Sequence, residues 1–460
     1  MTLPFGVVMF FQPVLTSYRH RRLRKIGSSV ANIISLFFGS ITEHRLERHM
    51  RTSTYVLSSS LSFPSILYNT LLPQVSLAML CTLGKVIILL TASAGSSTLV
   101  FGKPVVQIRG PPSSILSFDF AVHLNLSLGG SKIADLDRAR AATWFAGLGR
   151  RDGSISATNT GADKKYQPTT SSVNLGKNVS VSYGSGRMLG VEYNDTITLS
   201  PDLVIKEQSI GVANTTSGFA GYDGILGLGP VASTANTVQN TSTVPTVMDN
   251  LHAQGKIQNE VFAVSFAPTT TEPNGNGVIT FGGVDESKYV GDITYVPITK
   301  TSPASKYWGI DMGVTYGASA KNIIGSASGI VDTGSTLFLL ATDAFNAYTN
   351  ATGARIDTDT GLLKIENDAY DRLESLYFSI GGTTFELTKN AQTFPRPLNE
   401  FIGGDKNAIY LIVGDLGINI GAGLDFINGY AFLERFFTVY DATNQRIGFA
   451  VTPNTNSTSN

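Results

Sequence analysis

The stretch SGIVDTGSTLFLL, residues 328–340, places one acidic residue on a glycine-containing turn between two apolar runs. Short runs rich in Ile, Val, Leu and Phe, bounded by Gly and Ser, are typical of buried strands. Gly334 permits a sharp turn, which lets the Asp332 carboxylate accept backbone N–H groups and stay ionised where water is scarce. An Asp that only caps a turn fits the same letters equally well. A catalytic role for Asp332 therefore requires a second carboxylate elsewhere in the chain.

Composition indicates a β-rich globular protein. The chain has 460 residues with 47 Gly, 42% hydrophobic and 15% charged residues, which argues against disorder and for more than one packed unit. Beyond residue 152, runs such as GVEYNDTITL and GVITFGG alternate with Gly, Asn, Pro and Ser turns and predict an all-β fold. The clearest helix is expected from Asp343 to Tyr348 with Thr342 as its N-cap. The terminal TPNTNSTSN has the composition of a solvated tail.

The charge is balanced overall but divided along the chain. Residues 153–460 hold 18 Lys and Arg against 28 Asp and Glu, whereas residues 1–152 hold 16 against 6. This division predicts that the basic front part and the acidic body are two segments with different fates in the mature protein. The alternative is an unrelated local bias in composition. The acidic body argues against nucleic acid as a partner.

A secretory signal is predicted at residues 79–94. The stretch begins with Met, carries Lys85 before an apolar core, and ends in small residues, which is the layout of a cleaved signal. Cleavage would remove Cys81, the single cysteine of the chain. Residues 1–78 carry a basic run but no motif, so their status is doubtful and translation from the Met of the signal is the simplest hypothesis. A membrane span over residues 75–94 is the weaker alternative, because Lys85 interrupts it.

Sequons of the form Asn-x-Ser/Thr fit passage through a glycosylating pathway, although chance accounts for some of them in a chain rich in Ser and Thr. The predicted location is therefore secreted or extracellular, with the vacuole as an alternative. The sequons lie at Asn125, Asn178, Asn194, Asn214, Asn240, Asn350 and Asn456.

A helical stripe is predicted between the signal and the body. In GGSKIADLDRARAATWFAGLGRR, Ile133, Leu136 and Trp144 share one face of a helix. One interpretation is an amphipathic helix that packs on the body. The other is a detachable prosegment, residues 95–151, which would explain the charge division because a basic strip can cover an acidic cleft until it is removed.

Six motifs follow one another along the chain: VSYGSG at 181–186, DGILGLGP at 223–230, FGGVDESKYVGDITYVPI at 281–298, YWGIDM at 307–312, VDTGST at 331–336 and FINGYAFLERFFTVYDATNQRIGFA at 426–450. Their order and spacing resemble those of the pepsin-like aspartic endopeptidases. They are most similar to those of the secreted, cysteine-poor fungal branch, the polyporopepsin type. The resemblance begins near residue 115 and includes LDRARA, which is similar to the prosegment of that branch. One Asp-Thr-Gly is a weak signal, whereas six ordered motifs argue strongly against chance.

The resemblance implies an all-β, bilobal fold with a cleft between two similar lobes, residues 152–288 and 289–460. The hairpin tip YGSG would form a mobile flap over the cleft, although a plain hairpin turn is the alternative. The segments ILGLG and FINGY would each pack against the active-site loop of their own lobe. The implied flap residues are Tyr183, Gly184, Ser185 and Gly186.

The implied activity is that of a hydrolase, an aspartic endopeptidase secreted as a zymogen. Two carboxylates about 3 Å apart would share one proton, so that one activates water while the other protonates the carbonyl oxygen at acidic pH. The implied partner is an extended polypeptide bound as an added strand to a monomeric enzyme. No metal or cofactor is expected, because no two of the five His stand at HExxH spacing. Asp332 would be the catalytic residue of the second lobe, supported by Thr333, Gly334, Ser335 and Thr336.

The first-lobe carboxylate expected upstream of the flap is missing. Only Asn159-Thr160-Gly161 echoes its motif, and an amide at Asn159 could not share the proton. The favoured interpretation is that a segment of about 30 residues, judged by the resemblance and carrying one or two core strands, is absent between Thr160 and Gly161, because no apolar strand precedes Asn159. Asp152 and Asp163 lie in polar contexts and are expected on the solvated surface.

An incomplete first lobe would affect both folding and function. Missing strands leave sheet edges unpaired and apolar faces uncovered, which predicts aggregation and loss of activity. The alternative function is a non-catalytic pepsin-like protein that binds a peptide or protein in its cleft. The missing carboxylate favours this alternative, and the intact Tyr183 and Asp332 argue against it.

Overall fold

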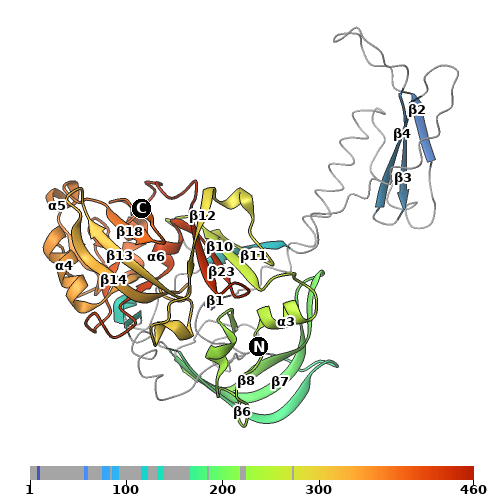
Figure 1. The fold of residues 1–460 in the computed structure, drawn as a ribbon, viewed down its shortest axis with the longest axis horizontal. Helices are drawn as coiled ribbons and strands as arrows, with labels where there is room; N and C mark the ends of the chain where they lie inside the picture. The colour runs from blue at the N-terminus through green and yellow to red at the C-terminus, as the bar shows by residue number, and fades with distance from the viewer. Residues whose placement is uncertain are drawn as a thin grey trace, which may run out of the picture. The chain divides into compact units, whose positions relative to one another are not determined.

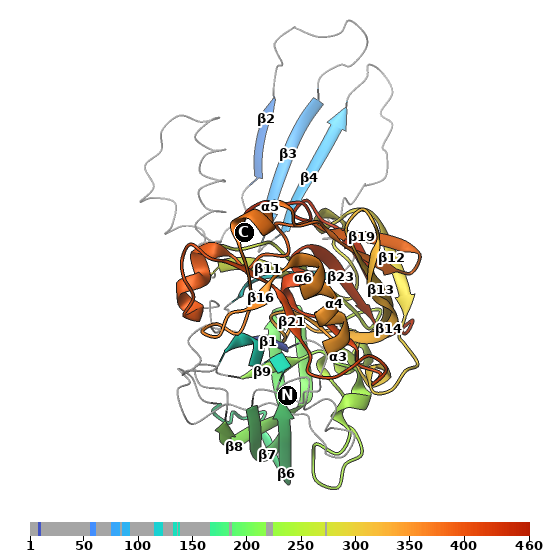
Figure 2. The same cartoon turned by 90° about the vertical axis from the view of Figure 1, so that its left-hand side faces the viewer.

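The computed structural model describes residues 8–10, 56–60, 75–82, 85–92, 115–122, 132–135, 137–138, 166–183, 186–217, 224–271 and 274–460. The chain divides into two compact units, Met1–Gln12 with Pro111–Asn460, and Pro13–Gly110, and each unit is described by itself. Strands dominate both units (Figure 1, Figure 2), so the all-β prediction is confirmed.

Three antiparallel strands form the described part of the smaller unit. β2 (Val56–Ser60) pairs with β3 (Val75–Thr82), which pairs with β4 (Lys85–Ala92). Most of the predicted signal lies in β3 and β4, whose apolar residues include several that favour extended backbone. No helix within the described residues is both long and apolar enough to cross a membrane. The signal itself stays a prediction.

A six-stranded antiparallel sheet joins distant parts of the larger unit, in the order β12-β24-β23-β10-β11-β5. β5 lies within the predicted prosegment and pairs with β11, where Leu116 stands opposite Phe281. The predicted prosegment therefore contributes a strand to the body. The strands are β5 (Leu116–Val122), β10 (Val261–Phe266), β11 (Asn274–Phe281), β12 (Val290–Pro297), β23 (Phe436–Asp441) and β24 (Arg446–Val451).

The Asp-Thr-Gly motif lies in a seven-stranded sheet of order β19-β18-β13-β14-β22-β15-β21. The two apolar runs around the motif are β14 (Lys321–Val331) and β15 (Phe338–Leu340), as the sequence predicts. The other strands are β13 (Gly309–Tyr316), β18 (Leu376–Ile380), β19 (Thr383–Leu387), β21 (Val413–Asp415) and β22 (Phe426–Asn428). A separate three-stranded sheet contains β16 (Arg355–Ile356), β17 (Leu363–Ile365) and β20 (Ile409–Leu411).

The first lobe includes a three-stranded sheet that carries the predicted hairpin. β6 (Val173–Tyr183) and β7 (Gly186–Ser200) form the predicted hairpin, and β8 (Leu203–Ser217) pairs with β7. Figure 1 and Figure 2 show these three strands as a body apart from that of β13, β14 and β18. This separation agrees with two lobes.

Helices are few and short in the described part of the chain. α4 (Thr342–Thr352) confirms the predicted helix but corrects its start, because Ala341 is the N-cap and the Thr342 hydroxyl instead donates to Asp415 at 2.7 Å. α3 (Val247–Ala253) carries a capping box. The remaining helices are α5 (Asn367–Asp371) and α6 (Tyr430–Leu433), and the 3₁₀ turns are η2 (Val231–Thr234), η3 (Glu286–Lys288), η4 (Ala304–Lys306) and η5 (Arg396–Ile402).

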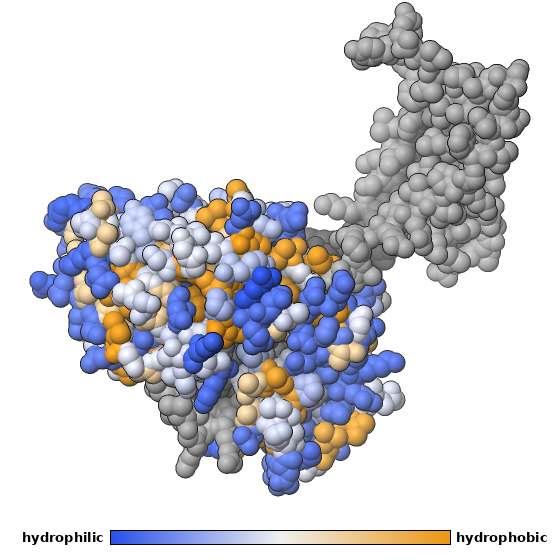
Figure 3. Space-filling model, viewed as in Figure 1, coloured by the Kyte–Doolittle hydropathy of each residue, from blue (hydrophilic) through white to orange (hydrophobic). Residues whose placement is uncertain are grey.

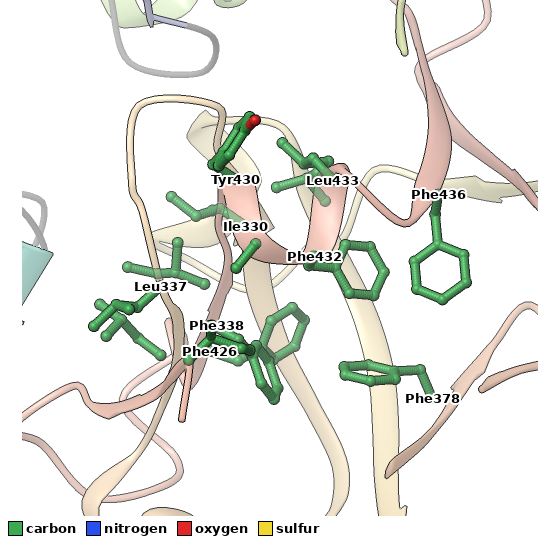
Figure 4. Packing of buried hydrophobic residues seen from close by; sticks show 14 of the residues in the cluster. Ile330, Leu337, Phe338, Phe378, Phe426, Tyr430, Phe432, Leu433 and Phe436 are labelled. Atoms are coloured by element: carbon green, nitrogen blue, oxygen red, sulfur yellow. The ribbon is translucent and has the colours of Figure 1, made fainter. Parts of the chain in front are cut away.

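Aromatic rings form the core of the second lobe around α6 (Figure 4). The ring centroids of Phe338 and Phe378 are 5.1 Å apart, those of Phe378 and Phe432 are 5.0 Å apart, and those of Phe432 and Phe436 are 4.8 Å apart. Fully burying each such ring stabilises the fold by about 2 kcal/mol. This continuous packing fixes β15, which follows the Asp-Thr-Gly turn, and α6, whose Tyr430 N–H donates to Ser335 of that turn.

The carboxyl-terminal segment packs back on the second lobe, which corrects the expectation of a solvated tail. The buried Arg435 guanidinium donates to the carbonyl oxygen of Ser457 at 2.6 Å, and the Asn460 amide donates to that of Thr393 at 2.7 Å. Backbone carbonyls, rather than side-chain hydrophobicity, therefore hold the tail. The face of the larger unit seen in Figure 3 is mostly hydrophilic with scattered apolar patches, as on ordinary protein surfaces.

Candidate active site

Asp332 sits on the turn between β14 and β15 and is only 1% exposed. The Gly334 N–H donates to its Oδ1 at 3.0 Å, and the Ser335 hydroxyl donates to its Oδ2 at 2.7 Å. Hydrogen bonds to a carboxylate favour its charged form. The turn therefore holds both oxygens of Asp332 in place, where water has almost no access.

The segment FINGY fixes this turn from behind. β22 runs parallel to β14, and the Asn428 carbonyl accepts a hydrogen bond from the Asp332 N–H at 3.0 Å. The Tyr430 N–H donates to the Ser335 carbonyl at 2.7 Å, and a side chain at Gly429 would collide with the Leu337 carbonyl oxygen. Glycine is thus required for the close approach of the two segments. The contact agrees with the role that the resemblance assigns to FINGY.

An aromatic cluster lies against the buried side of Asp332. Burial, and next to it the charge of Asp332, raise the pKa of Tyr440 well above its ordinary value. Tyr440 packs edge-on to Trp308 with ring centroids 5.3 Å apart, and Phe262 stacks on Tyr440 at 4.6 Å. The Trp308 indole N–H donates to the Leu228 carbonyl at 3.0 Å, which ties the segment ILGLG to the second lobe.

The corresponding support in the first lobe differs within the residues that the structure describes. In the second lobe, β22 lies between β14 and β15. Within the described residues, its counterpart β9 (Ile225–Gly227) pairs only with β1 (Val8–Phe10), in antiparallel fashion. No described strand thus stands beside β9 as β14 and β15 stand beside β22. The predicted positions Asn159, Thr160 and Gly161, and the two acids Asp152 and Asp163, lie outside the described residues.

A second Asp-Thr-Gly stands at residues 359–361 and was not among the predicted site residues. It occupies the turn between β16 and β17, where Asp359 is exposed and the hydroxyl of Thr360 donates to Asp357 at 2.8 Å. Gly361 adopts a left-handed conformation with φ of 76°. Its surroundings are those of an ordinary hairpin turn, so this copy does not supply the missing carboxylate.

The predicted flap residues lie at the end of the β6–β7 hairpin. Tyr183 stands directly opposite Gly186 in the register of the two strands. The tip residues Gly184 and Ser185 lie outside the described residues. The hairpin that carries the predicted flap is therefore present, and its role in binding stays a prediction.

Glu434 is a second buried carboxyl beside α6 that the sequence did not reveal. It is 4% exposed, burial raises its pKa to about 8, and the charge of Arg435 together with a hydrogen bond from Tyr430 opposes that rise. The Tyr430 hydroxyl also accepts a hydrogen bond from the Asn276 amide at 2.6 Å. A carboxyl in this setting is neutral at neutral pH. In the described part of the chain, no three His, Cys, Asp or Glu side chains are arranged to hold a metal ion.

Comparisons with known proteins match most of the body. The family model described as eukaryotic aspartyl protease matches residues 141–452. The chain is 57% identical over 311 residues to polyporopepsin from Irpex lacteus. This match covers 67% of this chain and 91% of that protein. It is 32% identical over 290 residues to rhizopuspepsin-1 from Rhizopus niveus, covering 62% of this chain and 68% of that protein.

A solved structure gives the same result. The crystal structure of an aspartic proteinase from Irpex lacteus superposes with a TM-score of 0.64 at 53% sequence identity, over 67% of this chain and 92% of that one. These matches confirm the resemblance to pepsin-like enzymes of the polyporopepsin type and the pepsin-like fold.

Proposed function

Because the chain belongs to the eukaryotic aspartyl protease family, we propose that Asp332 is one of the two catalytic carboxylates of an aspartic endopeptidase. The observation that carries the proposal is the burial of Asp332 with a donor on each of its oxygens. In the family mechanism, a water molecule lies between two carboxylates that share one proton. The ionised carboxylate takes a proton from the water as it attacks, and the protonated one donates to the carbonyl oxygen of the peptide.

The second carboxylate belongs to a first-lobe turn that this chain lacks between Thr160 and Gly161. The described surroundings of β9 support this placement, because among the described strands β1 alone pairs with β9, whereas the second-lobe motif has β14 and β15 on the two sides of β22. A protein of this sequence would therefore not hydrolyse peptides. The form that contains the segment would be the active enzyme.

The substrates are polypeptides, which would bind in extended form by adding a strand in the cleft beneath the flap. Secretion as a zymogen, with residues 79–94 as signal and 95–151 as prosegment, follows from the sequence patterns. The pairing of β5 with β11 supports the prosegment, since it ties this region to the body. Glycosylation is supported by the exposure of five sequons, at Asn178, Asn214, Asn240, Asn350 and Asn456.

The test compares two substitutions in the protein expressed from its natural gene. Asp332→Asn should lower the rate of peptide hydrolysis at about pH 4 by roughly 1,000-fold or more, because an amide can neither share nor accept the proton. The matched control is Asp359→Asn, which changes the exposed copy of the same motif and should leave the rate unchanged. Hydrolysis that survives Asp332→Asn would overturn the proposal.

A non-catalytic binding function is the second candidate, favoured by Asn159-Thr160-Gly161 at the place where the first motif is expected. The discriminating probe is a statine-type transition-state mimic added to the chain as it stands. Binding of the mimic without peptide cleavage would support a binding protein. Failure to bind, together with aggregation, would support a chain whose first lobe is incomplete.

A further inference from the structure

Tyr430 is the first residue of α6, and its backbone holds the turn that carries Asp332. Its N–H donates to the Ser335 carbonyl at 2.7 Å, and the Ser335 hydroxyl donates to Oδ2 of Asp332 at 2.7 Å. Tyr430 is only 6% exposed. In Figure 4 its side chain points away from the rings of Phe338 and Phe426. The position of Tyr430 therefore affects where Ser335, and with it one oxygen of Asp332, can lie.

The Tyr430 hydroxyl lies in a buried chain of hydrogen bonds. It accepts the Asn276 amide at 2.6 Å and donates to the carboxyl of Glu434, which is 4% exposed. Buried polar groups are costly unless they are hydrogen-bonded, so each of the three side chains depends on the others. Asn276, Tyr430 and Glu434 are named the Tyr430 network.

The network is anchored in the hairpin of β10 and β11. Asn276 belongs to β11, and its amide also donates to the Ala267 carbonyl at 2.6 Å, while the Ala267 N–H donates to the Asn276 carbonyl at 2.9 Å. The Tyr430 ring packs edge-on to Phe266 of β10, with ring centroids 5.1 Å apart. Ring and hydroxyl together therefore fix Tyr430 to the six-stranded sheet, whereas Asp332 lies in the seven-stranded one.

The corresponding segment of the first lobe has no such hydroxyl. ILGL at residues 225–228 and INGY at residues 427–430 align at their glycine, and Leu228 then stands where Tyr430 stands. Leu228 is fully buried. An apolar side chain therefore suits this position, and the tyrosine hydroxyl adds directed hydrogen bonds that leucine cannot make.

We propose that Tyr430 is a positioning residue for the Asp332 turn, and that its hydroxyl, held between Asn276 and Glu434, maintains the contact with the Ser335 carbonyl. The importance of this residue for catalysis rests on the proposed function, in which Asp332 is a catalytic carboxylate. Tyr430 acts through Ser335 and not on the bound peptide. Small displacements of a reacting group can cost a large part of the rate, so a looser turn should lower turnover rather than substrate affinity.

The first test measures hydrogen–deuterium exchange by mass spectrometry in the full-length chain, with fragments that resolve the amides of position 430 and of Gly334. Tyr430→Phe keeps the ring that packs on Phe266 and removes only the hydroxyl. It should speed exchange of both amides about tenfold, because the first donates to Ser335 and the second to Oδ1 of Asp332. Fragments from β13 and β18 report whether the second lobe remains folded.

Tyr440→Phe is the matched control. It also removes the hydroxyl of a fully buried tyrosine, but within the part of the chain that the structure describes this hydroxyl has no hydrogen-bond partner. The control should therefore leave exchange of both amides unchanged. An equal effect of the two variants would overturn the proposal, as would unchanged exchange in a folded Tyr430→Phe variant.

A second variant keeps the test decisive if Tyr430→Phe fails to fold. Asn276→Ala leaves Tyr430 in place but removes the donor to its hydroxyl from a position 154 residues away. It should speed exchange of the same two amides. Unchanged exchange in this variant would equally overturn the proposal.

Peptide hydrolysis provides a readout that a merely structural role would not move. In the protein expressed from its natural gene, Tyr430→Phe should lower kcat about tenfold and leave KM unchanged. A raised KM with an unchanged kcat would contradict the positioning role. Exchange needs no catalysis, so unchanged exchange leaves the role of Asp332 intact, and hydrolysis that survives Asp332→Asn leaves the contact between Tyr430 and Ser335 intact.

Discussion

The hydrogen bonds of Asp195 offer a quantitative test of how the first lobe is stabilised. They fix the backbone that follows the proposed missing segment between Thr160 and Gly161. The Asp195 carboxylate is 4% exposed and accepts the hydroxyls of Tyr166, Ser171 and Ser172, each at 2.6 Å. Burial opposes the charge of Asp195, but these hydroxyls and the Thr196 N–H outweigh it and lower its pKa from 3.8 to about 2. Burial, and after it the hydrogen bond to Asp195, raise the pKa of Tyr166 to about 12.

Because the pKa of Asp195 is lower in the folded state than in the unfolded state, the unfolding free energy depends on pH. A tenfold change in the proton affinity of a carboxylate on folding corresponds to about 1.4 kcal/mol, so the network contributes about 2 kcal/mol at neutral pH. This contribution is fully present above the unfolded value of 3.8 and is lost as the pH falls through about 2. The protein should therefore lose about 2 kcal/mol of unfolding free energy through Asp195 between about pH 5 and pH 2.

Urea unfolding followed by circular dichroism at several pH values measures this loss. Asp195→Asn should be less stable than the wild type at about pH 5, and the difference should shrink toward pH 2 as the wild-type carboxylate becomes protonated. Asp202→Asn, in the exposed turn between β7 and β8, is the control and should keep the wild-type pH dependence. The reasoning is refuted if Asp195→Asn and the wild type lose stability in parallel over this range.

Two further predictions concern the second lobe. Gly429→Ala should lower stability by about 3 kcal/mol and depress the thermal midpoint, because the new methyl group would overlap the carbonyl oxygens of Leu337 and Ser335; an unchanged midpoint would count against the close approach. Glu434→Gln should make the unfolding free energy less dependent on pH at higher pH. Because folding raises the pKa of Glu434, the neutral carboxyl stabilises the folded wild type fully below the ordinary pKa of 4.5, and this stability is lost as the pH rises through about 8. A Glu434→Gln variant that shows the same loss of stability would contradict the assignment.

Local sequence patterns were sufficient to predict the turn of the second lobe that carries Asp332. The two apolar runs around Asp332 became β14 and β15, and Gly334 turned the chain so that its N–H met the carboxylate. The alternation of residues along a strand and the conformation required at a tight turn depend on only a few neighbouring residues, so a short stretch of sequence is enough to predict them. The helix near Asp343 was predicted for the same reason, although Thr342 turned out to bond Asp415 instead of capping it.

Long-range contacts were beyond this kind of prediction. Asp137 and Leu337 are separated by 200 positions, and nothing in the letters around either residue indicates that they meet. The letters around Glu434 do not mark it as buried, because its burial results from the tertiary packing of the segment that joins β22 to β23. The Asp-Thr-Gly at 359–361 shows the opposite limit, since identical letters place an exposed Asp359 on a hairpin turn between the short strands β16 and β17.

We propose that the active enzyme has a second carboxylate, encoded between Thr160 and Gly161. The most direct test is to sequence the mature transcript across the codons for Ser154 to Tyr166. We expect additional codons there, which encode an apolar strand followed by Asp-Thr-Gly. A transcript that runs from Thr160 directly to Gly161 would contradict it, and a catalytic role for Asp332 in this protein would then have to be abandoned.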